Sequence, residues 1–162
     1  MKELAFIKRS NERHWVGDGF PVRSLFTYDN LAQHISPFLL LDYAGPHAFT
    51  PTNARRGVGQ HPHRGFETVT YMLDGRMRHK DNHGNEGLLT PGSVQWMTAG
   101  RGLVHSEMPE QESGRMRGFQ LWVNLPARDK MTAPKYQEFA PDRIPQVAPV
   151  AGVSVKIIAG EV

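Results

Sequence analysis

The stretch HPHRGFETVTYML, residues 61–73, places two histidines one residue apart ahead of a run of alternating side chains. Residues two positions apart on a β-strand are separated by about 6.6 Å and point to the same face of the sheet. His61 and His63 can therefore direct their ring nitrogens toward one point. The run that follows, Glu67 to Leu73, is rich in β-branched and aromatic side chains and ends at Asp74-Gly75, which is typical of a strand followed by a turn.

A second pair with the same spacing lies downstream, in the stretch GRGLVHSEMPE of residues 100–110. His105 and Glu107 share one face of any strand that contains them. If this strand lies beside the strand of the first pair, three imidazoles and one carboxylate converge. Such a nitrogen and oxygen set suits a first-row transition metal, and it leaves coordination positions open for water, substrate or dioxygen.

Glu67 competes with Glu107 for the acidic position. On a straight strand Glu67 lies about 13 Å beyond His63, too far to share an ion, but a turn at Arg64-Gly65 can bring it back. The spacing alone leaves both acids open. The structural alternative places the first histidine pair in an exposed loop and makes His105 a hydrogen-bonded core residue. Two pairs with the same spacing favour the metal site over that alternative.

Of the remaining histidines, His79 and His83 border a predicted turn around Asn82 and Gly84, and His14, His34 and His47 lie in segments without a partner spacing. An isolated histidine is more often structural than metal-binding. We therefore expect the following to be surface or capping residues: His14, His34, His47, His79 and His83.

The composition narrows the functional classes. The 162 residues include no cysteine, which excludes disulfides, thiolate zinc sites and cysteine nucleophiles and fits a reducing compartment. The formal net charge is +3, but lysines and arginines are interspersed with acids, which argues against direct nucleic-acid binding. The longest apolar run, Pro37 to Leu41, is too short to span a membrane, and the N-terminus lacks the apolar stretch of a secretory signal. We expect a cytoplasmic protein with one domain over residues 1–162.

The 16 glycines and 12 prolines separate short β-rich runs along the whole chain. Because no long stretch has helical spacing, this pattern predicts an all-β barrel or sandwich. In the run Glu67–Leu73, alternation places Val69, Tyr71 and Leu73 on one face, which we expect to point inward. The clearest predicted strands are Phe38–Asp42, Glu67–Leu73, Val94–Met97, Gly118–Asn124 and Val153–Ala159.

The C-terminal part has a different character. Residues 126–149 contain five prolines, which predict an extended excursion over the surface because proline removes donors from a strand ladder. The final run, Val153–Ala159, is apolar and β-branched and stops without a polar tail, which indicates a longer chain that was cut or a second domain that was lost. Such a strand should pair with the barrel or with another copy of the chain, most simply in a homodimer.

Four stretches together carry a family resemblance: HPHRGFETVTYMLDG, PGSVQWMTAGRGLVHSEMP, SPFLLLDYAGP and QLWVNLPARDKM. With them the chain resembles the N-terminal barrel of the pirins, within the cupin superfamily, over essentially its whole length. The resemblance implies a cupin-type β-barrel, and it implies that the acidic ligand is Glu107 while Glu67 is a supporting residue. Pirins usually have two barrels, and this chain stops about where the second would begin. The ligands that the resemblance implies are His61, His63, His105 and Glu107.

Bacterial pirin-like proteins are similar to quercetin dioxygenases, which implies a flavonol and dioxygen as substrates and iron as the metal. Manganese, cobalt, nickel, copper and zinc accept the same ligands. Glu107 can take the proton of the flavonol hydroxyl. The alternative functions are a metal- or redox-responsive regulatory binding protein, as animal pirins suggest, and a barrel in which the metal only supports folding. Apolar candidates for a flat aromatic pocket are Phe49, Phe66, Met72, Met97 and Met108.

Overall fold

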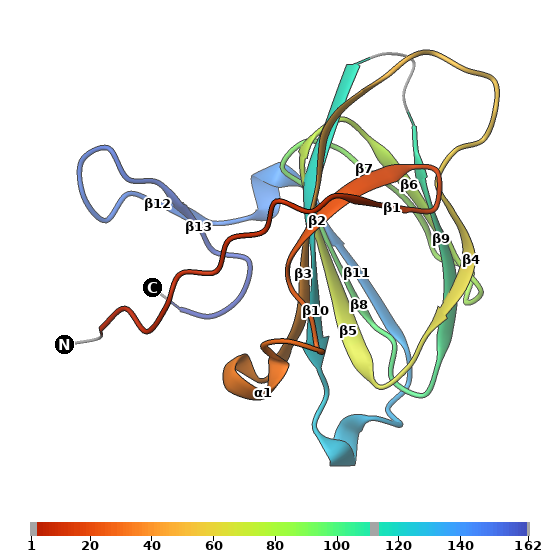
Figure 1. The fold of residues 1–162 in the computed structure, drawn as a ribbon. Helices are drawn as coiled ribbons and strands as arrows, with labels where there is room; N and C mark the ends of the chain where they lie inside the picture. The colour runs from red at the N-terminus through yellow and green to blue at the C-terminus, as the bar shows by residue number, and fades with distance from the viewer. Residues whose placement is uncertain (1–2, 111–113, 162) are drawn as a thin grey trace.

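The computed structural model describes residues 3–110 and 114–161, and these residues are organised almost entirely as β-strands (Figure 1). The all-β prediction is therefore confirmed. The strands are β1 (His14–Val16), β2 (Phe20–Phe26), β3 (Phe38–Phe49), β4 (Val58–His63), β5 (Phe66–Asp74), β6 (Met77–Asp81), β7 (Glu86–Leu89), β8 (Val94–Thr98), β9 (Leu103–Pro109), β10 (Gly114–Asn124), β11 (Lys135–Phe139), β12 (Gln146–Val147) and β13 (Val155–Lys156). The short helices are α1 (Ala32–Ile35), η1 (Ala127–Asp129) and η2 (Pro141–Arg143), and none of the helices in the described residues is long and apolar enough to cross a membrane.

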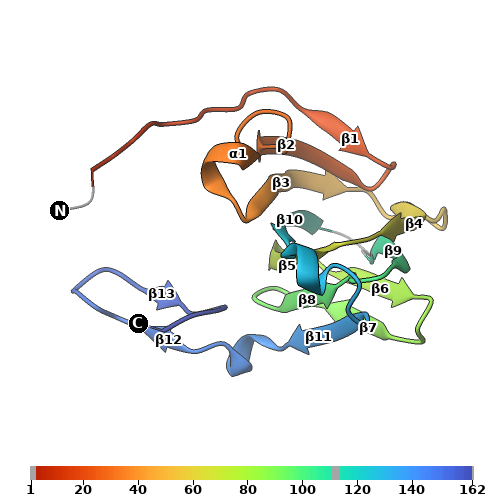
Figure 2. The same ribbon diagram turned by 90° about the horizontal axis from the view of Figure 1, so that it is seen from below.

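Two sheets of antiparallel strands face one another across a common interior (Figure 2). The larger sheet has seven strands in the order β1-β2-β3-β10-β5-β8-β11, and the smaller has four in the order β4-β9-β6-β7. A positive φ at Gly75 closes the turn from β5 to β6, where the Asp-Gly pair predicted a turn. Since β5 and β6 belong to different sheets, this turn carries the chain from one sheet to the other.

The two faces of β5 are the reverse of the prediction. Thr68, Thr70 and Met72 point into the interior, where all three are buried and the last two line a cavity between the sheets. Val69 and Tyr71 lie on the outer face of the sheet. Alternation separated the two sets correctly, but it did not show that a later part of the chain also covers the outer face.

That cover comes from the proline-rich segment. Its strand β11 pairs with β8, from Lys135 opposite Thr98 to Phe139 opposite Val94. Ile144 then packs with Val69 and Val94 in a buried apolar cluster. The segment is therefore part of the fold, and the expectation of a plain surface excursion was wrong for residues 135–144, because the prolines flank β11 and leave it free to pair.

The last predicted strand is much shorter than expected. Of Val153–Ala159 only Val155–Lys156 is β-structure, as β13, and it pairs with β12 in a separate two-stranded sheet. This hairpin and the extended N-terminal segment lie on the same side of the molecule, away from β4 and β9 (Figure 1). The other four predicted strands are present, each within a longer strand.

Candidate metal centre

Strands β4 and β9 bring the histidine pairs together. The two strands are neighbours in the smaller sheet, with His61 directly opposite His105 and His63 opposite Leu103. One ring nitrogen from each of the three histidines lies within 4.8 Å of the others. The Nε2 atoms of His63 and His105 are 2.9 Å apart, so both rings aim this nitrogen at the same small volume. Three imidazoles that converge in this way can bind a metal ion.

In two of these rings, the nitrogen that points away from the other histidines, Nδ1, already has a polar contact. The Nδ1 of His61 lies 2.8 Å from the carbonyl oxygen of Gly59, to which it donates a hydrogen bond. The Nδ1 of His105 lies 3.2 Å from the Nδ1 of His79. In a neutral imidazole whose Nδ1 carries the proton, Nε2 keeps its lone pair. The ring contacts therefore favour Nε2 of both residues as the free, metal-facing atom.

Burial keeps the inner rings neutral. Burial, together with the charge of His61, lowers the pKa of His63 to about 4. Burial also lowers the pKa of His105 to about 2, with the charges of the neighbouring histidines acting in the same direction. A metal binds the neutral imidazole, so these two rings need no deprotonation at neutral pH before they can act as ligands.

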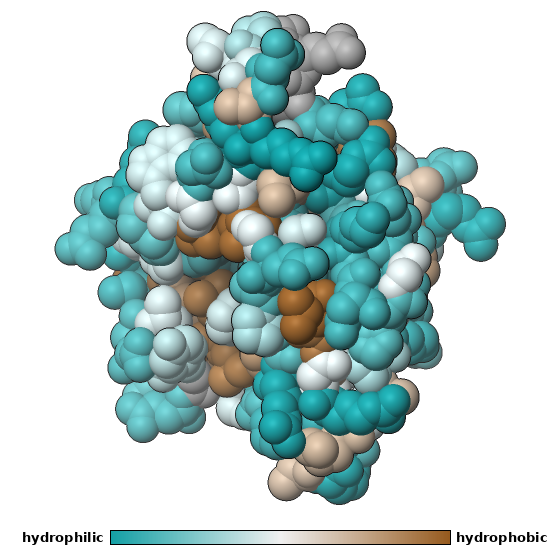
Figure 3. Space-filling model, turned by 90° about the vertical axis from the view of Figure 1, so that its right-hand side faces the viewer, coloured by the Kyte–Doolittle hydropathy of each residue, from teal (hydrophilic) through white to brown (hydrophobic). Residues whose placement is uncertain are grey.

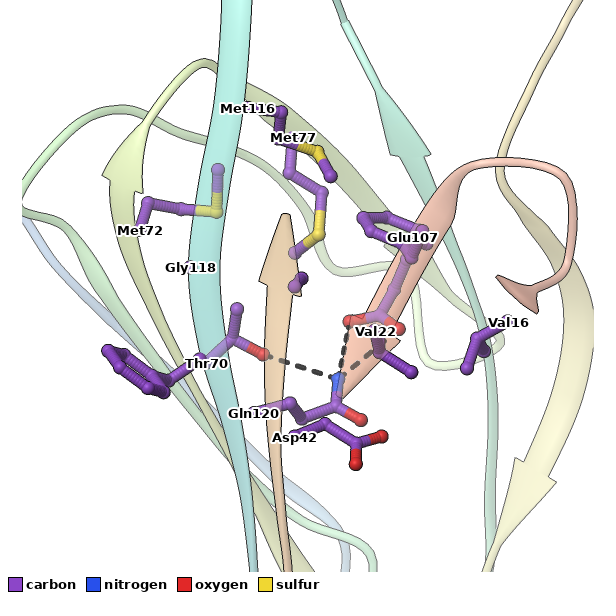
Figure 4. A pocket seen from close by; sticks show the side chains of 13 residues that line it. Val16, Val22, Asp42, Thr70, Met72, Met77, Glu107, Met116, Gly118 and Gln120 are labelled. Carbon is purple, nitrogen blue, oxygen red and sulfur yellow. Dashed lines mark hydrogen bonds between the residues drawn. The ribbon is translucent and has the colours of Figure 1, made fainter. Parts of the chain in front are cut away.

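Glu107 lies on the same buried face of β9 as His105. Its two carboxylate oxygens accept hydrogen bonds from Nε2 of Gln120 at 3.0 and 3.3 Å (Figure 4). Gln120 is oriented in turn by Trp122, whose Nε1–H donates to its amide oxygen at 3.1 Å. Burial raises the pKa of Glu107, while the charge of His61 and the hydrogen bond from Gln120 oppose that shift.

The competing acid points elsewhere. Glu67 is on the face of β5 that carries Val69 and Tyr71, and its carboxylate accepts a hydrogen bond from the Thr98 hydroxyl at 2.6 Å. The cavity that contains His61 and His63 is lined by Glu107 and not by Glu67. Glu107 thus shares a cavity with His61 and His63 while Glu67 lies on the outer face, but the described group of ligand atoms within 4.8 Å of one another comprises the three histidines without Glu107.

His61 and His63 open into a cavity of about 640 Å³, a size that holds a small organic molecule. Phe66 and Trp122 form part of its wall, with ring centroids 4.6 Å apart, and both rings contact His63 edge to face. Seen from the side of β4 and β9, the surface shows recessed apolar groups bordered by hydrophilic side chains (Figure 3). This cavity offers a flat aromatic surface beside the three imidazoles.

A narrower cavity of about 50 Å³ lies deeper in the interior. Met72, Met77 and Met116 gather at one end of it, and the Glu107–Gln120 pair lies at the other (Figure 4). Glu107 and Gln120 line both cavities, so this pair lies at the boundary between the metal-facing space and the methionine-lined space.

The five apolar pocket candidates are distributed over the whole interior. Phe66 lines the cavity at the histidines, and Met72 lines the narrower one. Phe49 and Met108 line a separate cavity of about 650 Å³ that also contains several arginines. Met97 is fully buried in a small apolar cluster with Ala99 and Leu103. Only Phe66 therefore lies where a ligand beside the histidines would contact it.

His79 contradicts the expectation of a surface residue. Its side chain is fully buried, with its ring centroid 5.2 Å from that of His105. The signal in the sequence was the alternation of MRHKD, in which Met77, His79 and Asp81 share the buried face of β6. His79 and Asp81 repeat the His-x-acid spacing of His105 and Glu107, but His79 borders the turn around Asn82 and Gly84, which made it resemble a surface residue. The contact partner of His79 lies on the neighbouring strand β9, and its spacing from His79 along the sequence gives no sign of the contact.

The other unpaired histidines are mostly as expected. His14, His34 and His83 are exposed. His47 is half-buried, between the rings of Trp15 and Phe49, so it packs rather than caps. Gln120 was not predicted as a site residue. Its signal in the sequence is that it is a polar residue inside the apolar run from Phe119 to Val123.

Comparison with known proteins agrees with this architecture. The family model described as Pirin matches residues 19–123. A Pseudomonas aeruginosa protein that is provisionally named as a quercetin 2,3-dioxygenase is 53% identical over 165 residues, which cover 99% of this chain and 58% of that protein. The chain therefore spans little more than half the length of this relative.

Solved structures show the same fold. The crystal structure of a quercetin 2,3-dioxygenase from Acinetobacter baumannii matches with a TM-score of 0.92 and 50% identity, over 96% of this chain and 56% of that one. A bacterial pirin from Escherichia coli, solved in complex with nickel(II), matches with a TM-score of 0.64 and 26% identity, over 79% of this chain and 53% of that one. With its cupin-type fold and a family match over most of its length, the chain belongs to the pirin family.

Proposed function

We propose that this protein holds one divalent transition metal and cleaves flavonols such as quercetin with dioxygen. The observation that carries the proposal is the convergence of three imidazoles, with a buried carboxylate nearby, at an aromatic-walled cavity of about 640 Å³. The proposed ligands are His61, His63, His105 and Glu107. Glu107 also has the proposed catalytic role.

The donor set fits a metal of this class. Two of the three rings have Nδ1 engaged and Nε2 free, and the remaining one aims Nε2 at the same volume. Imidazole nitrogen and carboxylate oxygen accept several first-row ions, and Fe(II) is the ion that we propose. The bound metal supplies Lewis acidity, which lowers the pKa of a coordinated hydroxyl group.

The chain's own residues would orient the substrate and move one proton. Phe66 and Trp122 offer their rings to a flat aromatic ligand, since both line the cavity beside His63. Glu107 is suited to accept the proton of the flavonol hydroxyl because burial raises its pKa. Gln120 holds the carboxylate of Glu107 in place through both oxygens. The buried setting of Glu107 keeps bulk water from competing for that proton.

The relatives support the substrate class. The Acinetobacter baumannii protein is named as a quercetin 2,3-dioxygenase, and the Escherichia coli pirin carries nickel(II). Because this chain covers only 58% of its Pseudomonas aeruginosa relative, transfer of a whole protein's activity is part of the proposal.

The test is oxygen consumption on quercetin by protein reconstituted with Fe(II), with carbon monoxide measured as the co-product. We expect turnover that requires the metal and falls strongly in Glu107→Gln, because the amide cannot accept the proton. Glu67→Gln is the matched control, since that carboxylate lies on the outer face. Metal bound at one ion per chain without oxygen uptake would contradict the dioxygenase and favour a binding role for the same site.

A further inference from the structure

We infer that His79 positions His105 for metal binding, because the Nδ1 atoms of these two buried rings lie 3.2 Å apart on the side of His105 that faces away from the other histidines. The inference rests on the proposed metal site and extends it to a residue outside the ligand set. His79 would select the tautomer and fix the ring angle of the ligand without contacting the metal itself.

The two nitrogens of His105 face in different directions. Nε2 lies 2.9 Å from Nε2 of His63, toward the convergence point, while Nδ1 contacts His79. For Nε2 to offer a lone pair to a metal, the ring proton must lie on Nδ1. Nδ1–H of His105 then donates to Nδ1 of His79. A proton on Nε2 of His105 instead would block metal binding, and Nδ1–H of His79 would then have to be the donor across the 3.2 Å contact.

The same assignment determines which nitrogen of His79 carries the proton. Because its Nδ1 accepts from His105, its own proton lies on Nε2. That nitrogen is 3.8 Å from the Oδ2 atom of Asp81, whose carboxylate is the nearest negative charge on β6. The order of groups from the metal position outward is therefore His105, His79 and Asp81, with each proton pointing outward toward the carboxylate. Metal-bound histidines commonly donate their second ring nitrogen in this manner.

The surroundings hold the His79 ring rigidly. The ring stacks on Tyr136 of β11, with centroids 5.0 Å apart and an interplanar angle of 23°. Asp81 is fixed in turn, since its carboxylate accepts hydrogen bonds from the backbone N–H groups of His83 and Asn85 and from the Asn85 side chain. A rigid acceptor is what a ligand ring needs, because freedom of the ring would cost entropy on metal binding.

A purely structural role explains these contacts less well. A fully buried imidazole is costly to desolvate, and Nε2 of His79 has no hydrogen-bond partner within 3.5 Å among the described residues. A phenyl ring would fill the same space against Tyr136 without that cost. The benefit of a nitrogen at this position is therefore the contact with His105.

The experiment compares metal affinity with the stability of the metal-free protein. We measure the Kd for Co(II), by competition with a chelator, and the visible spectrum of the Co(II) complex in wild type, His79→Phe and His79→Asn. We expect His79→Phe to weaken Co(II) binding about 10–100-fold and to change the spectrum. His79→Asn should recover part of the affinity, because its side-chain oxygen can accept the proton of His105. Tyr136→Phe keeps the stacked ring and should bind as wild type does.

The melting temperature of the metal-free proteins separates the two roles. A packing role predicts that Asn, the smaller and more polar replacement, is the worse substitution in every measurement. Positioning predicts the opposite order for Co(II), with Asn better than Phe, whatever the order of melting temperatures. If the phenyl ring prevents folding, His79→Leu provides the variant without an acceptor.

Two results would overturn the inference: wild-type Co(II) affinity and spectrum in His79→Phe or His79→Leu, or an equal loss in Asn and in the apolar variant. Neither readout depends on turnover. Failure of the dioxygenase proposal would therefore appear as absent oxygen uptake while the order of Co(II) affinities still holds. Failure of the ligand assignment would appear as full metal occupancy in His105→Ala.

Discussion

The two faces of the seven-stranded sheet are both covered, but the inner face carries buried polar side chains beside its apolar cluster, which contains Met72 and Met116. The outer face carries an apolar layer in which Val69 of β5 packs with Val94 and Ile144. One step along β5, Thr70 points inward and belongs to a row of polar side chains that crosses five neighbouring strands: Gln95, Thr70, Gln120, Asp42 and Ser24. That row faces the interior in which the histidines lie.

This difference suggests that the outer layer contributes mainly to stability, whereas the inner face supplies the polar groups around the site. Buried polar groups contribute little to stability and are costly when unpaired, whereas apolar burial contributes about 25 cal/mol per Å². The outer layer can therefore stabilise the sheet while its inner face holds hydrogen-bonding groups. A change in one layer should leave the other largely unaffected, and each prediction below tests that separation.

The largest effect is expected at the ligands of the inner face. His61→Ala and His105→Ala should each weaken metal binding by more than about 100-fold, since loss of a ligand exceeds the 10–100-fold effect of losing an outer partner. Metal per chain, from elemental analysis of purified protein, is the measurement. His83→Ala, in an exposed turn, is the control and should retain full occupancy. Full occupancy in His61→Ala would refute the ligand assignment.

The outer layer should show the reverse pattern. Ile144→Ala removes a buried side chain that packs on Val69 and Val94, and we expect the free energy of unfolding to fall by about 2–4 kcal/mol. Urea unfolding of the metal-free protein measures this change. The metal affinity of the folded variant should match wild type. A parallel loss of affinity would show that the two layers are coupled.

The two acids provide a comparison across the sheet itself. Glu107→Gln should weaken metal binding about 10-fold or more, equal to about 1.4 kcal/mol, because the amide keeps the shape and loses the charge. Glu67→Gln should leave the affinity unchanged, since its carboxylate binds Thr98 on the other face. Titration of both variants with Co(II) decides between them. A larger effect in Glu67→Gln would mean that the chain turns after His63 in a way that these contacts do not reflect.

The sequence predicted this site better than it predicted the layers around it. Period-2 spacing was sufficient to place His61 with His63 and His105 with Glu107, because it is a local property of a strand. The pairing of β4 with β9 joins residues far apart in the sequence, so residue spacing could not predict it and it had to be assumed. The inward direction of β5 was wrong for the same reason: both of its faces are buried, and alternation cannot tell an interior from a covered exterior.

His79 and Gln120 show a second limit of sequence reasoning. Each is polar and buried because of one contact with a residue far along the chain, His105 in the first case and Glu107 in the second. Their own strands show only that a polar residue lies on a buried face. The partner, and with it the role, becomes visible only when β6, β9 and β10 are placed in space.

The smallest effect on stability is expected at two adjacent residues of β5, where Thr68 is replaced by Val and Val69 by Thr. The Thr68 hydroxyl is fully buried on the inner face and has no hydrogen-bond partner among the described residues. Thr68→Val keeps the shape and removes that unpaired group, so we expect the free energy of unfolding to rise by about 0.5–1 kcal/mol. Metal affinity should stay as in wild type.

The reciprocal change supplies the matched control for this last prediction. Val69→Thr places a hydroxyl in the apolar outer layer, where we expect a loss of about 1–3 kcal/mol. Urea unfolding of both metal-free variants gives the two signs directly. If Thr68→Val is destabilising, its hydroxyl has a partner, such as a bound water, and the inner face contributes more to folding than the comparison of the two layers allows. Because the two substitutions run in opposite directions, opposite signs would show that an apolar side chain is the more stabilising one on both buried faces, so that the Thr68 hydroxyl is not retained for folding.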